Sequence, residues 1–172
     1  MRFFHRYKST IHGNYRKAYL RSGVLTGLLM MLYLLVRWLM HNPATSPAAY
    51  LTEGVLLVAV LLLTIYYRNT LPDRKATLKE LMLFGMGTAV LASLLYGIFV
   101  WIFGSLVPEQ ADLFTVTLRG EEALKEAPSH YWAAWWGIEA GIKLMVLGGF
   151  GAFISALIFK NEKGEIRTKK KK

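Results

Sequence analysis

Four charged residues stand inside otherwise apolar stretches of this sequence, and they are the residues best placed to do chemistry. Glu139 and Lys143 are four positions apart, in the favourable order for an ion pair within one helix. Arg37 and Glu53 lie on either side of a short polar connection and form a second candidate pair. Charges within a bilayer are costly and tend to be paired and functional. They predict either two neutralising pairs or a path for an ion, a proton or a polar substrate.

Other signals of chemistry are weak. The sequence contains no cysteine, which excludes disulfides, thiolate metal sites and a cysteine nucleophile. Its four histidines have no metal-ligand spacing, and it has neither a GxSxG motif nor a P-loop. We therefore expect no enzymatic activity, no cofactor and no metal site. The least favoured alternative is a lipid-handling enzyme with its site among Trp132, Trp135, Glu139 and His130.

The segments that must hold these charges are long and apolar. Hydrophobic residues make up 54% of the 172 residues, and residues 81–107 are 27 positions without a charge. About 20 such residues cross a bilayer as a helix. The apolar runs are continuous instead of alternating, so each must satisfy its own backbone groups as a helix. The sequence predicts an all-α polytopic membrane protein, a bundle of four transmembrane helices, at residues 22–40, 47–67, 80–107 and 132–159.

Local signals place the ends of these segments. Asn42-Pro43 ends the first, and Ser46-Pro47 suits the start of the second. Thr77 and Glu80 match a capping box, which predicts that the third helix begins near Thr77. We interpret the first segment as an uncleaved span because it is longer than the apolar part of a signal peptide. The transmembrane domain then covers residues 22–160, with an outer acidic loop at residues 108–131.

Basic residues are divided unequally between the connections. Residues 1–21 form a basic aromatic arm, and residues 161–172 form a basic tail. Together with residues 68–80 and Lys160, these two segments hold 17 Lys and Arg. The long outer loop holds only Arg119 and Lys125. By the positive-inside rule, four spans place both termini in the cytoplasm. The positive charge therefore indicates topology and anionic lipid, not nucleic acid. The lipid-facing basic run at the end of the chain is Lys169, Lys170, Lys171 and Lys172.

Small residues recur at helical spacing in the third and fourth segments. Such faces let backbones approach closely, which drives helix association in lipid. They predict either packing within one bundle or an interface with a second copy or a partner helix. The seams consist of Gly85, Ala89, Ser93 and Gly97 in the third segment and Gly137, Gly141, Gly148 and Ala152 in the fourth.

Several features follow one another along residues 47–160. They are Tyr67-Arg68 at the end of the second segment, Lys75 and Lys79 leading to Gly85, Leu106-Val107-Pro108 opening the acidic loop, and a glycine-rich last segment ending at Lys160. This layout resembles a family of small uncharacterised four-helix bacterial inner-membrane proteins, a domain of unknown function. The resemblance implies a bacterial inner (cytoplasmic) membrane location, and it transfers no catalytic residue.

Taken together, these observations predict a non-enzymatic structural or accessory subunit. Its small-residue seams would pack against partner transmembrane helices, and its basic face would hold anionic lipid. A small transporter or channel component that uses the intramembrane charges is the alternative.

Overall fold

The computed structural model describes residues 2–40, 50–71, 76–107 and 129–159, with side chains from residue 16 in the first helix and from residue 133 in the last. Its helices are α1 (Arg2–Leu39), α2 (Leu51–Thr70), α3 (Leu78–Leu106) and α5 (Ser129–Phe159). Each contains a stretch long and apolar enough to cross a bilayer. The predicted all-α, four-span fold is confirmed, and the chain is a multi-pass integral membrane protein.

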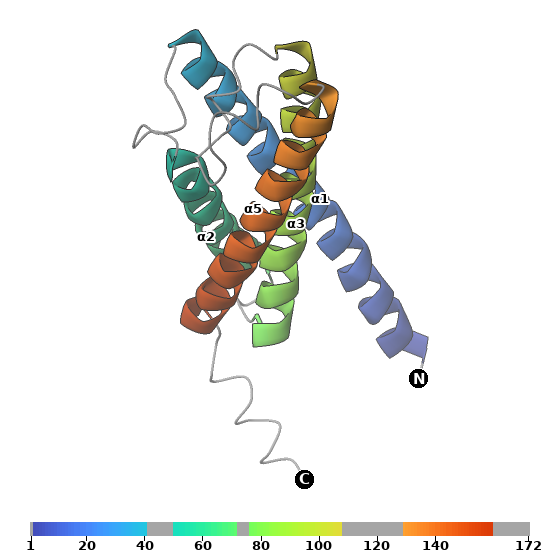
Figure 1. Ribbon diagram of the computed structural model, residues 1–172. Helices are drawn as coiled ribbons and strands as arrows, with labels where there is room; N and C mark the ends of the chain where they lie inside the picture. Colours follow the sequence, from blue (N-terminus) through green and yellow to red (C-terminus); the bar gives the residue numbers. More distant parts are fainter. Residues whose placement is uncertain (1, 41–49, 72–75, 108–128, 160–172) are drawn as a thin grey trace.

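The helices form an antiparallel bundle with α3 at its centre (Figure 1). α5 packs along α3 over most of its length, α1 crosses another face of α3, and α2 packs mainly against α5. α1 and α3 begin, and α2 and α5 end, at the same end of the bundle, which we call the inner end because the basic segments flank it. The opposite end is the outer end.

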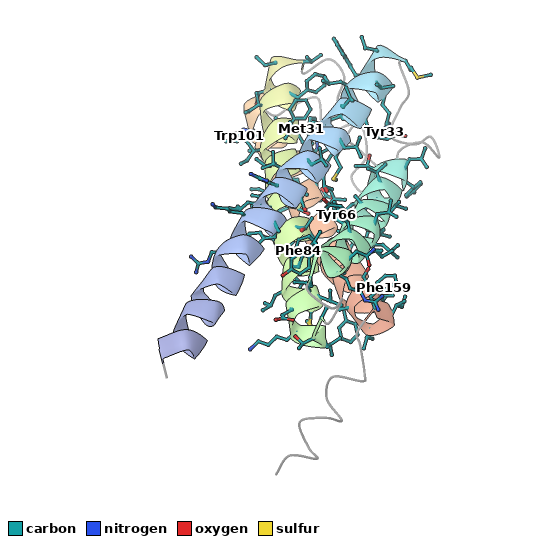
Figure 2. The ribbon with its side chains drawn as sticks, turned by 180° about the vertical axis from the view of Figure 1, so that it is seen from behind. Met31, Tyr33, Tyr66, Phe84, Trp101 and Phe159 are labelled. Carbon is teal, nitrogen blue, oxygen red and sulfur yellow. The ribbon has the colours of Figure 1, made fainter. Side chains whose placement is uncertain are left out.

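α1 is much longer than the predicted span. It runs unbroken through Gly13 for 38 residues, or about 57 Å at 1.5 Å per residue, nearly twice the thickness of a bilayer core. The basic arm is therefore a direct extension of the first span. Below Tyr19, which packs against Gly87 of α3, α1 diverges from the other helices (Figures 1 and 2).

The start of α3 follows its sequence signal. The Thr77 hydroxyl accepts a hydrogen bond from the Glu80 N–H (3.2 Å), and the Glu80 carboxylate accepts one from the Thr77 N–H (3.0 Å). The predicted capping box is confirmed. α2 spans Leu51–Thr70, and the Thr70 hydroxyl donates to the Tyr67 carbonyl. Ser46 and Pro47 lie outside the described residues.

The core follows the inward face of α3. Near the inner end the rings of Phe84 and Tyr67 stack with centroids 4.3 Å apart, which fixes α2 against α3. Near the outer end Trp38 of α1 meets the edge of Phe103 at 5.5 Å. The outward faces of all four helices carry large exposed aliphatic side chains, as expected for a surface in contact with lipid hydrocarbon.

Candidate functional site

An ion pair joins the first turn of α2 to the middle of α5. The Lys143 ammonium pairs with a carboxylate oxygen of Glu53. This corrects the predicted pairing of Lys143 with Glu139: Glu139 is exposed and makes no ion pair among the described residues. Helical side chains point toward the N-terminus of their own helix, which for α5 is the outer end. Lys143 therefore reaches toward the first turn of α2, where Glu53 lies.

Arg37 is the most deeply buried charged residue among those that the structure describes. Only 5% of it is exposed, although it belongs to the last turn of α1. By contrast, 25% of the Glu53 side chain and 56% of the Lys143 side chain are exposed. The ion pair thus lies toward the edge of the bundle, whereas the guanidinium lies inside it.

Tyr96 of α3 lies near Arg37 and Glu53. It is buried, Thr52 of α2 lies beside its hydroxyl, and the groups within its electrostatic reach are Tyr33, Arg37 and Glu53. Thr52 is 5% exposed, and its hydroxyl makes no hydrogen bond of good geometry. The outer polar cluster, as we name it, therefore draws on all four helices and consists of Tyr33, Arg37, Thr52, Glu53, Tyr96 and Lys143.

The sequence analysis found three members of this cluster and missed three. Tyr33 lies one helical turn before Arg37, and Thr52 directly precedes Glu53. Proximity to a charge was the available signal for both. Tyr96 stands in a 27-residue uncharged run, where an aromatic ring is equally compatible with a lipid-facing position, so nothing local marked it.

The cluster stops partway through the bundle. Below it, the interior is closed by buried Leu56, Val60 and Ala92. Further in, the Thr64 hydroxyl donates to the Val60 carbonyl and the Ser155 hydroxyl to the Gly151 carbonyl, so these two are satisfied within their own helices. The described residues hold no group of three His, Cys, Asp or Glu suited to a metal ion. Thr88 of α3 is also fully buried, and its hydroxyl has no hydrogen-bond partner among the described residues.

The small-residue seams lie between α3 and α5. A methyl group added at Gly85 would lie 2.7 Å from the Ala152 side chain, and one added at Gly148 would lie 2.6 Å from that of Ala89. Farther out, Gly97 faces Gly137. These contacts place the seam residues where α3 and α5 pack against each other.

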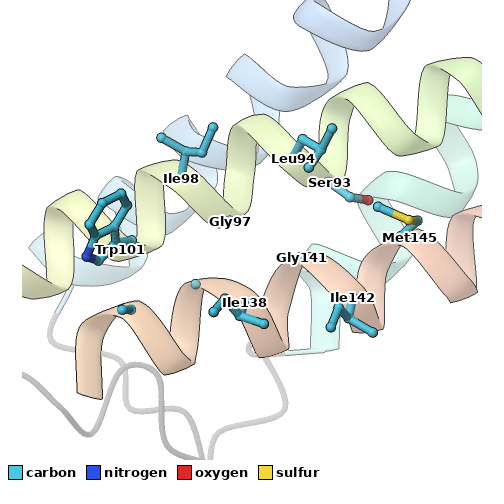
Figure 3. Close-up of a pocket in the computed structure, with 11 residues that line it drawn as sticks. Ser93, Leu94, Gly97, Ile98, Trp101, Ile138, Gly141, Ile142 and Met145 are labelled. Atoms are coloured by element: carbon cyan, nitrogen blue, oxygen red, sulfur yellow. The ribbon is translucent and has the colours of Figure 1, made fainter. Parts of the chain in front are cut away.

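An apolar groove of about 400 Å³ runs along the lipid-facing side of the same crossing (Figure 3). Ile98 and Trp101 of α3 form one of its sides. Ser93 lies at its inner end, fully buried, and its hydroxyl has no hydrogen-bond partner among the described residues. The other lining residues include Gly97, Gly137, Ile138, Gly141 and Ile142.

The remaining predicted site residues are not gathered in one place. Trp135 is exposed toward lipid, whereas Trp136 is buried against Gly104. Neither the side chains of His130 and Trp132 nor the outer acidic loop is described. Lys169, Lys170, Lys171 and Lys172 also lie outside the described residues.

Comparisons with protein-family models, with curated proteins and with solved structures found no match for this chain. The class of protein is therefore defined by the fold alone, as a four-span helical membrane protein.

Proposed function

We propose that this chain is a non-enzymatic accessory subunit that receives a partner transmembrane helix in the groove between α3 and α5. The observation that supports the proposal is the shape of the groove, a floor of small residues between two apolar ridges. Small residues let a second backbone come close, and close packing is the main source of helix association in lipid.

The length of the groove also suits a partner helix. Its α3 side extends from Ser93 to Trp101, which is about 12 Å along the axis, or roughly two turns of a partner.

Anionic lipid completes the proposed role on the inner side. Arg16, Lys17, Arg21 and Lys79 are exposed near the inner ends of α1 and α3. Basic side chains at a membrane surface attract anionic lipid by about 1 kcal/mol each. This supports an inner-membrane protein with its basic face toward the cytoplasm.

Two substitutions on α5 test the groove. Ile142 lines the groove, and Val146, which is one turn away and also exposed, does not. We expect Ile142→Trp to fill the groove and reduce the membrane proteins that co-purify from native membranes in mild detergent, and Val146→Trp to leave them unchanged. A purified chain that is monomeric and crosslinks to no partner in native membranes would contradict the proposal.

A second candidate function, a small transporter or channel component, is favoured by the outer polar cluster. Four helices converge on it, and intramembrane charges typically mark substrate or ion pathways. Replacing Glu53 and Lys143 together with glutamine should then abolish flux into liposomes while the protein remains folded. Unchanged flux of every ion tested would count against this candidate.

A further inference from the structure

Glu139 is an acidic residue on the lipid-facing surface of α5. It is exposed, and it lies six positions inside the span that begins at Ala133, or about 9 Å along the axis. Trp135 and Ile142, its neighbours one turn away in either direction, are exposed as well. Long Lys and Arg side chains escape such positions by reaching the interface, but the glutamate stem is shorter. Its charge therefore stays among apolar side chains, where it is costly.

The described residues give Glu139 no opposite charge. Lys143, one turn away, is held by Glu53 of α2, and Glu139 makes no ion pair among the residues that the structure describes. Charged residues within a membrane usually face the interior of a bundle and pair with one another. Glu139 does neither, and this indicates that its counter-charge comes from a second molecule.

The position of Glu139 coincides with the middle of the groove between α3 and α5. A methyl group added at Gly97 of α3 would meet both Gly137 and Gly141 of α5, so Gly97 is level with Glu139. Gly97 is also the midpoint of the α3 side of the groove. Ile142, which lies beside Glu139 on the helix surface, lines the groove (Figure 3). A helix seated in the groove therefore passes next to the carboxylate.

We propose that the partner helix in this groove carries a lysine or an arginine that pairs with Glu139. The pair forms at the level of Gly97, where the floor of small residues lets the two backbones approach most closely. Lys143 does not compete for this position, because its own partner is on α2, which contributes no residue to the lining of the groove. The inference rests on the proposed function, and it adds the chemistry of the partner.

Synthetic transmembrane helices serve as probes of the partner. Each is a leucine–alanine helix of about 20 residues with one Lys, Gln or Glu about six positions from one end, the depth of Glu139 in its span. The chain has no cysteine, so Leu106→Cys, at the exposed outer end of α3, can carry a fluorescent donor. Energy transfer to an acceptor on the probe then measures binding to the full-length protein in nanodiscs of zwitterionic lipid.

We expect the Lys helix to bind more tightly than the Gln and Glu helices. Glu139→Gln should weaken binding of the Lys helix by about three- to tenfold, as expected for a polar contact between helices in a membrane. Glu139→Lys should reverse the preference, so that the Glu helix binds best. Both variants should fold, because Glu139 is exposed. Ile142→Trp, which fills the groove, should weaken binding of all three helices, whereas Val146→Trp should leave it unchanged.

Three results would overturn the inference. In the first, the three helices bind equally or not at all. Equal binding that Ile142→Trp still weakens would leave the proposed function standing without this inference. In the second, the preference for Lys persists in Glu139→Gln and Glu139→Lys, because the cation would then be recognised elsewhere. In the third, energy transfer between two labelled copies of the chain is lost in Ile142→Trp and is not displaced by the Lys helix, which would identify a second copy as the occupant of the groove.

Discussion

Gly97 on α3 and Gly137 on α5 lie against each other with almost no space between their backbones. A methyl group added at Gly97 would lie 2.6 Å from the Gly137 carbonyl oxygen, and one added at Gly137 would lie 2.5 Å from the Gly97 carbonyl oxygen. Both distances are shorter than real Cβ contacts, and the atoms met belong to backbone, which cannot swing aside. The two helices reach this separation only because both positions are glycine.

Gly137→Ala should therefore lower the free energy of unfolding. Overpacking of a tight contact costs about 1–3 kcal/mol. Gly141→Ala, one turn along the same helix, is the matched control: its new methyl group would meet the Ser93 carbonyl oxygen at 3.5 Å, an ordinary contact. Unfolding in mixed micelles with increasing denaturing detergent measures both. Equal stability of the two variants would show that α3 and α5 are farther apart than described.

Two adjacent glycines of α5 offer a second comparison. Gly148 faces the Ala89 side chain, and a methyl group there would also come within 3.1 Å of Leu56, whereas a methyl group at Gly149 would meet nothing within 4 Å. We expect Gly148→Ala to be destabilising and Gly149→Ala to be neutral or stabilising by up to about 1 kcal/mol, since alanine favours helix over glycine. Thermal unfolding of both variants in one detergent would compare their stabilities. If Gly149→Ala were the more destabilising substitution, a different face of α5 would pack against α3 than the one described.

Sequence reasoning was most successful where the signal is local. The span count follows from apolar length, and the start of α3 follows from Thr77 and Glu80, because a capping box involves only residues three positions apart. The predicted start of the second helix at Ser46 and Pro47 lies outside the described residues and stays a prediction.

The polar cluster depended on tertiary structure and was predicted only in part. The spacing of Glu139 and Lys143 is a local signal for a pair within one helix. The actual partner, Glu53, is 90 positions away in the sequence, and it meets Lys143 only because the first turn of α2 lies beside the middle of α5. Which residues of two helices face each other depends on their rotation and register, which apolar periodicity does not determine.

Removal of the cap of α3 should have a defined cost. Thr77→Ala deletes the hydroxyl that accepts the Glu80 N–H, and the loss of such a cap typically costs about 1 kcal/mol. Thr77→Ser keeps the hydroxyl and should restore most of the stability. Amide hydrogen exchange of the first turn of α3 would detect the change locally. Equal exchange in the alanine and serine variants would mean that the capping box contributes nothing to the start of this helix.

The stacked rings of Tyr67 and Phe84 should be important for holding α2 in place. Phe84 is fully buried, with its ring nearly parallel to that of Tyr67 at an interplanar angle of 5°. Phe84→Ala removes the stack and leaves a cavity, at a cost of about 3–5 kcal/mol. Phe84→Leu fills part of the space and should cost less. Denaturation in detergent gives both values, and a cost for Phe84→Ala below that for Phe84→Leu would contradict the packing described.

The ion pair between Glu53 and Lys143 predicts a coupling that a double-mutant cycle can isolate. The single variants Glu53→Gln and Lys143→Gln each leave the other charge without its partner, and the double variant removes both charges. We expect a coupling free energy of about 1 kcal/mol, because the pair is only partly buried and hydrogen-bonded contacts in membranes contribute modestly. The same cycle between Glu139 and Lys143 should give a value near zero, since Lys143 pairs with Glu53 and Glu139 makes no ion pair among the described residues. Coupling between Glu139 and Lys143, with none between Glu53 and Lys143, would contradict the ion pair described. Lys143 would then pair within α5 and not with α2.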